Sequence, residues 1–187
     1  MKQQELFIVQ SLLNPYLITV AAEKGHLHII EFLRLEIAAS QDENVLEECD
    51  ALVTELAAAN GHVAILDWAL ANSNWYLDAI LREAIKNSQF KVLVWLKTQF
   101  PNILQLDYPI PLNIAAEYSD IEVFKWLRNN GAKWDVNTIV CAKDGENEDI
   151  VDWAIENRCP KGGYKRKPKY ASRKKGRLQL SHYREQA

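Results

Sequence analysis

Histidine and cysteine side chains are the groups in this sequence that could bind a metal ion or act as nucleophiles. His26 and His28 are the closest pair, but residues two apart on a helix do not share a face. His182 lies in a basic segment with no partner for a site. Zinc needs several converging ligands, whereas the cysteines form no CxxC pair and are widely spaced: Cys49, Cys141 and Cys159. We therefore expect no metal site, no cofactor and no disulfide framework, and free thiols indicate a reducing compartment.

An acid-rich stretch, KDGENEDIVDW at 143–153, has a composition that could suggest calcium binding. It lacks the alternating ligands and the distant bidentate glutamate of an EF-hand loop. Its carboxylates surround the expected start of a helix, where the helix dipole favours negative charge: Asp144, Glu146, Glu148 and Asp149. We interpret the stretch as the beginning of a helix rather than as a cation site.

The sequence contains no familiar catalytic signature: it has no G-x-S-x-G, no P-loop and no glycine-rich phosphate cradle. Cys141 falls at a small position of a predicted packed helix, which favours a packing role over a nucleophilic one. We therefore expect no enzymatic activity and no small-molecule ligand.

A repeated pattern indicates which elements position these residues. Two small residues, a short polar stretch, a turn and an apolar run recur five times, and the last copy has one extra residue in its turn. The copies are AAEKGHLHIIEFL (21–33), AAANGHVAILDWA (57–69), AIKNSQFKVLVWL (84–96), AAEYSDIEVFKWL (115–127) and CAKDGENEDIVDWA (141–154). One aromatic register recurs at intervals of 36, 27, 31 and 27 residues, and we predict that it points inward: Phe32, Trp68, Trp95, Trp126 and Trp153. Trp75 and Trp134 fall outside this register, near unit junctions, and we expect packing roles for both.

Each copy reads as two helices joined by a tight turn. The paired small residues allow a first helix to approach its neighbour closely, and Gly25 or Gly61 ends that helix because glycine adopts the left-handed conformation without strain. His26 and His62 occupy equivalent turn positions, which favours a structural role for both. Ser88 and Ser119 stand in place of the glycine in two units, at a higher conformational cost. The second helix then presents one broad apolar face, made in the first unit by Ile29, Ile30, Phe32 and Leu33. Two short helices cannot bury such a face alone, so the pairs must stack.

The pattern resembles the ankyrin repeat, whose core reads roughly A-A-x-x-G-H-x-x-[IV]-[VI]-x-x-L followed by a closing G-A. Ala57-Ala58, Gly61-His62, Ile65 and Leu66 match it, and Asn130-Gly131-Ala132 stands at the closing position. The helix-opening T-P-L-H motif survives only as Pro111-Leu112, and two intervals fall short of the family's period of about 33 residues. The shortfall lies where the family has its hairpin finger, so the resemblance implies truncated fingers. Short-period units with a tryptophan late in the second helix resemble the arrays of large amoeba-infecting viruses and of amoebae.

The sequence therefore predicts an all-α solenoid of about five stacked ankyrin-like helix-turn-helix repeats over residues 15–160. Residues 1–14 are predicted to form an N-terminal capping helix that ends at Asn14-Pro15 and covers the first unit with its apolar residues: Leu6, Phe7, Val9, Leu12 and Leu13. The acidic insertion ASQDENVLEECD at 39–50 is either a loop or a short extra turn of helix. Residues 161–187 form a basic tail that we predict to be disordered.

Partner binding is implied by the resemblance, because ankyrin-like arrays hold partner proteins on the exposed side of their first helices and on the fingers. By alignment, this concave face comprises Glu23, Lys24, Glu55, Ala59, Asn60, Arg82, Lys86, Glu117, Tyr118 and Lys143. If the relatives are viral arrays, the partner is a host protein.

The tail carries a separate signal in its charge. Residues 161–187 contain ten Lys and Arg and one acid, a net charge of +9, whereas the other 160 residues carry −12. Two clusters supply most of the positive charge: Lys165, Arg166, Lys167 and Lys169, then Arg173, Lys174, Lys175 and Arg177. Such runs act as nuclear-import signals, or bind nucleic acid by neutralising phosphates with help from stacking tyrosines, or serve as solubilising tails resting on an acidic body.

We hypothesise a non-enzymatic protein–protein interaction scaffold whose tail serves nuclear targeting or electrostatic contact. The alternative is a nucleic-acid-binding protein that acts through the tail. The N-terminus has Glu5 early and Pro15 midway, unlike a signal peptide. No apolar run approaches the roughly 18 residues of a membrane span. We therefore expect an intracellular protein, cytoplasmic or nuclear, that is neither secreted nor transmembrane and contacts no membrane.

Overall fold

The regular structure of this chain is helical throughout the part that can be described. The computed structural model describes residues 15–39, 43–72, 76–105 and 111–162, and within these ranges it contains ten α-helices, one 3-10 helix and no β-strand. The helices are α2 (Pro15–Lys24), α3 (Leu27–Ala39), α4 (Glu43–Asn60), α5 (Val63–Asn72), α6 (Leu77–Lys86), α7 (Phe90–Gln99), η1 (Ile103–Gln105), α8 (Pro111–Tyr118), α9 (Ile121–Asn129), α10 (Thr138–Asp144) and α11 (Glu148–Glu156). The predicted all-α fold class is therefore confirmed for the described residues.

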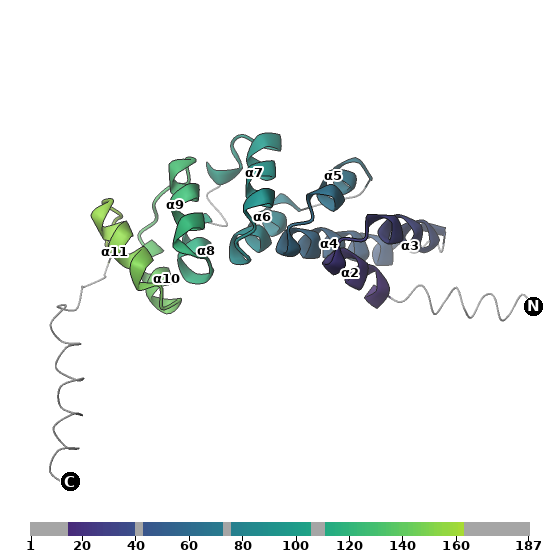
Figure 1. The fold of residues 1–187 in the computed structure, drawn as a ribbon, viewed down its shortest axis with the longest axis horizontal. Helices are drawn as coiled ribbons and strands as arrows, with labels where there is room; N and C mark the ends of the chain where they lie inside the picture. Colours follow the sequence, from purple (N-terminus) through teal and green to yellow (C-terminus); the bar gives the residue numbers. More distant parts are fainter. Residues whose placement is uncertain (1–14, 40–42, 73–75, 106–110, 163–187) are drawn as a thin grey trace, which may run out of the picture.

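The α-helices form five consecutive pairs that follow one another along an elongated row (Figure 1). The first helices of the pairs, α2, α4, α6, α8 and α10, contact one another in sequence, and each also contacts the second helix of its own pair. In Figure 1 the second helices α5, α7 and α9 lie above the first helices of their pairs. The order of the pairs in space is therefore their order along the chain.

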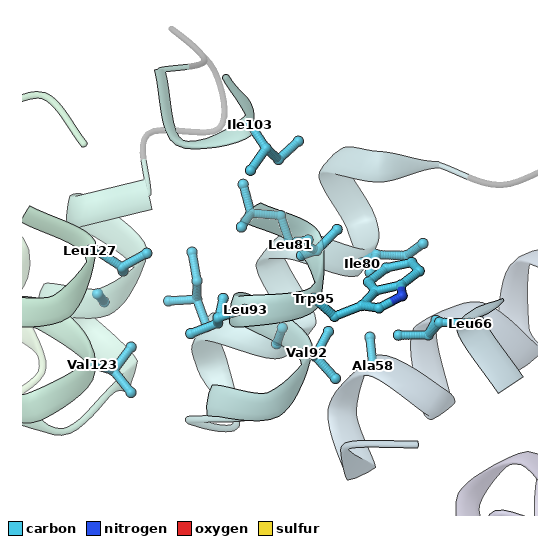
Figure 2. Close-up of a cluster of buried hydrophobic side chains, with 14 of the residues drawn as sticks. Ala58, Leu66, Ile80, Leu81, Val92, Leu93, Trp95, Ile103, Val123 and Leu127 are labelled. Atoms are coloured by element: carbon cyan, nitrogen blue, oxygen red, sulfur yellow. The ribbon is translucent and has the colours of Figure 1, made fainter. Parts of the chain in front are cut away.

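The core lies between the first and second helices and continues from pair to pair (Figure 2). The predicted small residues are buried on the first helices and allow these helices to pack closely: Ala21, Ala22, Ala57, Ala58, Ala84, Ala115, Ala116 and Ala142. Cys141, predicted to occupy a buried position of the same kind, is half-buried. Fully buried apolar residues of the second helices, such as Leu93 and Phe124, fill the layer behind them.

The turns between paired helices follow the prediction in the first two units. Gly25 and Gly61 have φ of +78° and +79°, in the left-handed region. Ser88 adopts the same region with φ of +51°, and a serine there is strained. In the fifth unit the extra residue shifts the turn, so Glu146 takes the left-handed conformation with φ of +58°.

Gly145 in that fifth turn is needed for a different reason. Its φ of −80° is open to any residue, but a Cβ atom there would lie 2.1 Å from the carbonyl oxygen of Glu117. The turn of the fifth unit therefore packs directly against the backbone of the fourth.

The inward orientation predicted for the aromatic register is only partly correct. Trp95 is buried, and Trp68, Trp126 and Trp153 are half-buried against the core, but Phe32 is 54% exposed. Ile29 is also exposed, so the broad apolar face predicted for the first unit is wrong: only its Ile30 and Leu33 side is buried. The later units are covered by the unit before them, whereas no described residue precedes the first.

Trp134 packs as predicted, outside the repeated register. Its ring lies 6.0 Å from that of Phe124 and 6.1 Å from that of Trp153, measured between centroids, and the Arg128 guanidinium lies 5.0 Å from its centre. It therefore fills the junction between the fourth and fifth units.

The acidic insertion is helical where it is described. Residues 43–50 form the start of α4, which at 18 residues is the longest helix among those described, so the insertion extends the first helix of the second unit. Asp50 faces α3, where its carboxylate accepts two hydrogen bonds from Arg34 at 2.8 and 2.9 Å. The predicted capping helix over residues 1–14, Trp75 and the tail from residue 163 onward lie outside the described residues.

Candidate protein-interaction surface

Hydrogen bonds join the C-terminal ends of α2, α4, α6 and α8 to the turn of the following unit. In the turns of the second to fifth units, a polar side chain donates to a backbone carbonyl near the end of the preceding first helix. The bonds run from His62 Nε2 to Glu23 (2.8 Å), from Gln89 Nε2 to Ala59 (2.9 Å), from Ser119 Oγ to Ile85 (2.5 Å) and from Asn147 Nδ2 to Ala116 (2.8 Å). His62 has a structural role, as the sequence predicted, and the structure adds that it donates a hydrogen bond to the preceding unit.

The predicted concave-face residues occupy this row, with unequal exposure. Those open to solvent are Glu23, Lys24, Asn60 and Tyr118. Those half-buried are Glu55, Ala59, Arg82, Lys86, Glu117 and Lys143. All of them lie on the first helices, in the half of each helix that leads into the turn.

The structure groups four of these residues, together with Glu83, near Tyr118, which is 54% exposed. The Lys86 ammonium lies 5.5 Å from the centre of the Tyr118 ring, close enough for a cation–π contact. Glu83 joins the basic side chains, at 3.4 Å from Lys86 and 3.8 Å from Arg82. A hydrogen bond between the Tyr118 hydroxyl and Glu117 raises the pKa of that hydroxyl. We call Arg82, Glu83, Lys86, Glu117 and Tyr118 the Tyr118 patch.

The other predicted residues do not join this patch. Lys24 pairs with its neighbour Glu23 at 2.8 Å, and Asn60 donates to the carbonyl of Leu56 at 2.9 Å. Lys143 pairs with Glu148 inside its own unit. These contacts are local to single units, so they do not link neighbouring units as Lys86 and Tyr118 do.

Sequence reasoning missed Glu83 in this patch and Tyr76 at the opposite, N-terminal end of α6. Glu83 was not singled out, although its spacing of three from Lys86 on one helix is a signal for a side-chain pair. Tyr76 was also missed: it is 50% exposed, its hydroxyl donates to Glu47 at 3.1 Å, and this bond raises the pKa of the hydroxyl. A shallow cavity of about 250 Å³ lies beside it, lined by Asn44, Glu47, Glu48, Ala51 and Tyr76.

The three cysteines are all held toward the neutral thiol form by their surroundings. Burial raises the pKa of Cys49 and Cys141, and it raises the pKa of Cys159 to about 11, which disfavours the thiolate at neutral pH. No group of three or more His, Cys, Asp or Glu residues is placed there to hold a metal ion. Among the same residues, no helix is both long and apolar enough to cross a membrane.

Comparison with known proteins does not assign this chain to a family, so it is classified by its fold. No family model matches the chain, and no curated protein matches it. The structure defines an all-helical protein whose helices pack in sequence.

Proposed function

We propose that this chain is a non-enzymatic, ankyrin-like scaffold that binds a partner protein through the exposed ends of its first helices. The observation that carries the proposal is the Tyr118 patch, where an exposed tyrosine of one unit is held by a lysine of the preceding unit. The patch lies on α6 and α8, with first helices of other units on both sides. It is the centre of the proposed binding surface.

The chemistry of the patch suits recognition of a protein. Tyrosine and arginine are favoured at the centres of protein interfaces, because they bury much area and also offer hydrogen bonds. Tyr118 already contacts Lys86 and Glu117, so less side-chain freedom is lost when a partner binds. First helices spaced about 8–10 Å apart give a five-helix row roughly 40 Å long, which can supply the roughly 800 Å² per partner of a standard interface.

A capture experiment with a matched control tests the proposal. The full-length chain, Tyr118→Ala and Tyr76→Ala are immobilised and exposed to cell lysate with and without nuclease treatment. The control is close, since Tyr76 and Tyr118 are 50% and 54% exposed and each hydroxyl is hydrogen-bonded to a glutamate. We expect one discrete protein on the unsubstituted chain and on Tyr76→Ala, bound at least about tenfold more weakly by Tyr118→Ala, as for a hot-spot residue. Equal capture by both variants, or loss of all capture with nuclease, would contradict it.

Nucleic-acid binding through the tail is the second candidate, and the observation that favours it is the net charge of +9 over residues 161–187. Binding by phosphate neutralisation weakens steeply with salt. A full-length variant with both basic clusters changed to glutamine would then lose oligonucleotide binding, whereas Tyr118→Ala would keep it. If the tail is instead an import signal, the same variant would leave the nucleus without any change in protein capture.

A further inference from the structure

The aromatic register of the second helices faces the preceding unit in every unit from the second to the fifth. Each of the four tryptophans contacts a side chain one unit earlier. The contacts are Trp68 with Arg34 (5.6 Å from its guanidinium carbon to the ring centre), Trp95 Nε1 with Asp67 (2.6 Å), Trp126 with Phe90 (6.1 Å between ring centroids) and Trp153 with Phe124 (5.8 Å). Figure 2 shows the Trp95 ring directed toward Leu66 of the preceding unit. The aromatic residue at this register therefore packs against the unit on its N-terminal side.

Phe32 holds that register in the first unit, and the part of the chain that the structure describes offers it no such neighbour. The side chain is 54% exposed, against 8% for Trp95. The difference follows from position rather than from residue type, because all five residues are large aromatics at the same place in the repeat.

Two further positions show the same contrast. Ile29 is 37% exposed, whereas its counterparts are at most 1% exposed: Ile65, Val92, Val123 and Ile150. Leu17 on α2 is 38% exposed, whereas Val53 and Ile80 at the same place on α4 and α6 are each 1% exposed. We call Leu17, Ile29 and Phe32 the N-terminal end face. At these three places an apolar side chain is exposed only in the first unit, so the three form a surface made to be covered.

We propose that residues 1–14 of the same chain cover the N-terminal end face, as an amphipathic helix in the place of the second helix of a preceding unit. The segment joins the first unit directly, because α2 begins at Pro15. Its length matches one second helix of the row, since α5 and α7 have 10 residues each.

The sequence of the segment supplies the required chemistry. Leu6, Val9 and Leu13 recur at spacings of three and four, which places them on one side of a helix; Leu12 and Ile8 extend that side, whereas Phe7 falls on the opposite, more polar side. Attachment to α2 gives this occupant a high effective concentration, which a second copy of the chain would have to exceed.

Thiol labelling in the full-length chain tests the proposal. A cysteine is introduced by Ile29→Cys, and its alkylation rate is compared with that of Val94→Cys, on an exposed position of α7 that is 49% exposed. Peptide mass spectrometry separates the new thiol from the three native cysteines. We expect Ile29→Cys to react at least about tenfold more slowly than Val94→Cys. Equal rates would overturn the proposal.

A second pair of substitutions identifies the occupant. Adding Leu12→Asp and Leu13→Asp to the Ile29→Cys chain should raise the labelling rate toward that of Val94→Cys, whereas Gln3→Asp with Gln4→Asp should leave it slow. Labelling that stays slow in the Leu12 and Leu13 variant, or a slow rate that depends on protein concentration with a dimer in light scattering, would assign the face to another occupant and overturn the proposal.

A measurement on the unsubstituted chain tests the proposal even if the variants do not fold. Hydroxyl-radical footprinting reports the exposure of Phe32 directly, with Tyr118, equally exposed at 54%, as the internal reference. After correction for intrinsic reactivity, we expect Phe32 to be oxidised several-fold more slowly than Tyr118. Oxidation at the same corrected rate would overturn the proposal whatever the variants do.

Discussion

At the scale of single residues, the Arg34–Asp50 pair is the most buried ion pair in the described ranges. Asp50 is 4% exposed, and Arg34 donates to both of its carboxylate oxygens while lying 5.6 Å from the ring centre of Trp68. The hydrogen bond to Asp50 is the main cause of a raised pKa for Arg34. The pair joins α3 to α4, and the contact of Arg34 with Trp68 links both helices to α5.

We predict that Arg34→Ala lowers the free energy of unfolding by about 3–4 kcal/mol, because it leaves a buried carboxylate without its partner. Urea unfolding measures the loss. Arg82→Ala is the matched control: Arg82 is half-exposed and 3.8 Å from Glu83, so its removal should cost below about 1 kcal/mol. Equal losses for the two variants would show that the buried pair is not a stabilising link.

Cys159 predicts a pH dependence of stability. Burial raises its pKa to about 11, above the value of roughly 8.5 for an exposed thiol, so the folded state favours the neutral form. The stabilisation is therefore fully present below about pH 8.5 and is lost as the pH rises toward 11.

The comparison of Cys159→Ala with the unsubstituted chain isolates this effect from the titration of tyrosine and lysine. We expect the difference in melting temperature between the two proteins to shrink as the pH rises from 8 to 11. A difference that stays constant over this interval would mean that the thiol titrates normally in the folded protein.

At the scale of helices and turns, two glycines serve different purposes. Gly25 is required by its φ of +78°, and an added Cβ atom there would also lie 2.8 Å from the His62 side chain, whereas an added Cβ atom at Gly145 would lie 2.1 Å from the backbone carbonyl oxygen of Glu117. At Gly25 the backbone strain and the nearby His62 side chain can both adjust locally. At Gly145 the clash is with the backbone of the fourth unit, so the fourth and fifth units must move apart.

We predict that Gly145→Ala costs about 2–3 kcal/mol, as expected for overpacking, and that Gly25→Ala costs about 1–2 kcal/mol, the cost of backbone strain. Chemical denaturation of the two variants gives the order. The reverse order would show that the fourth and fifth units separate easily at this turn.

At the scale of the whole molecule, the described helices form a row in which each first helix contacts those before and after it. Stability in such a row is approximately a sum of unit and nearest-neighbour contributions, so units with two neighbours are the most protected. This arrangement makes the Tyr118 patch a central and rigid surface.

We predict that amide hydrogen exchange is slowest in α6 and α8 and fastest in α11. Mass spectrometry of the exchanging full-length chain gives the profile, and α10 should be intermediate because it has a first-helix neighbour on one side. Uniform protection along the row would show that the chain opens only as a single unit.

Much of the helical layout could be predicted because its causes lie within each repeat. Paired small residues, a turn glycine and an apolar run specify a helix, a turn and a second helix, and Gly25 and Gly61 do adopt the predicted conformation. The ankyrin assignment, the partner surface and the role of the tail stay predictions. The Tyr76–Glu47 contact depends on side-chain placement that repeat alignment does not reveal, whereas the spacing of three between Glu83 and Lys86 was visible in the sequence.

The sequence by itself determined the helical class, the five units and the turn positions, since these depend on local conformational preference and on apolar periodicity. Only the tertiary structure decided which equivalent residues are buried. Phe32 and Trp95 occupy the same register, yet the first is exposed and the second buried, because burial depends on the unit that precedes each. The tertiary structure likewise decided that Lys86 contacts Tyr118, since the distance between two units is set by how their first helices stack.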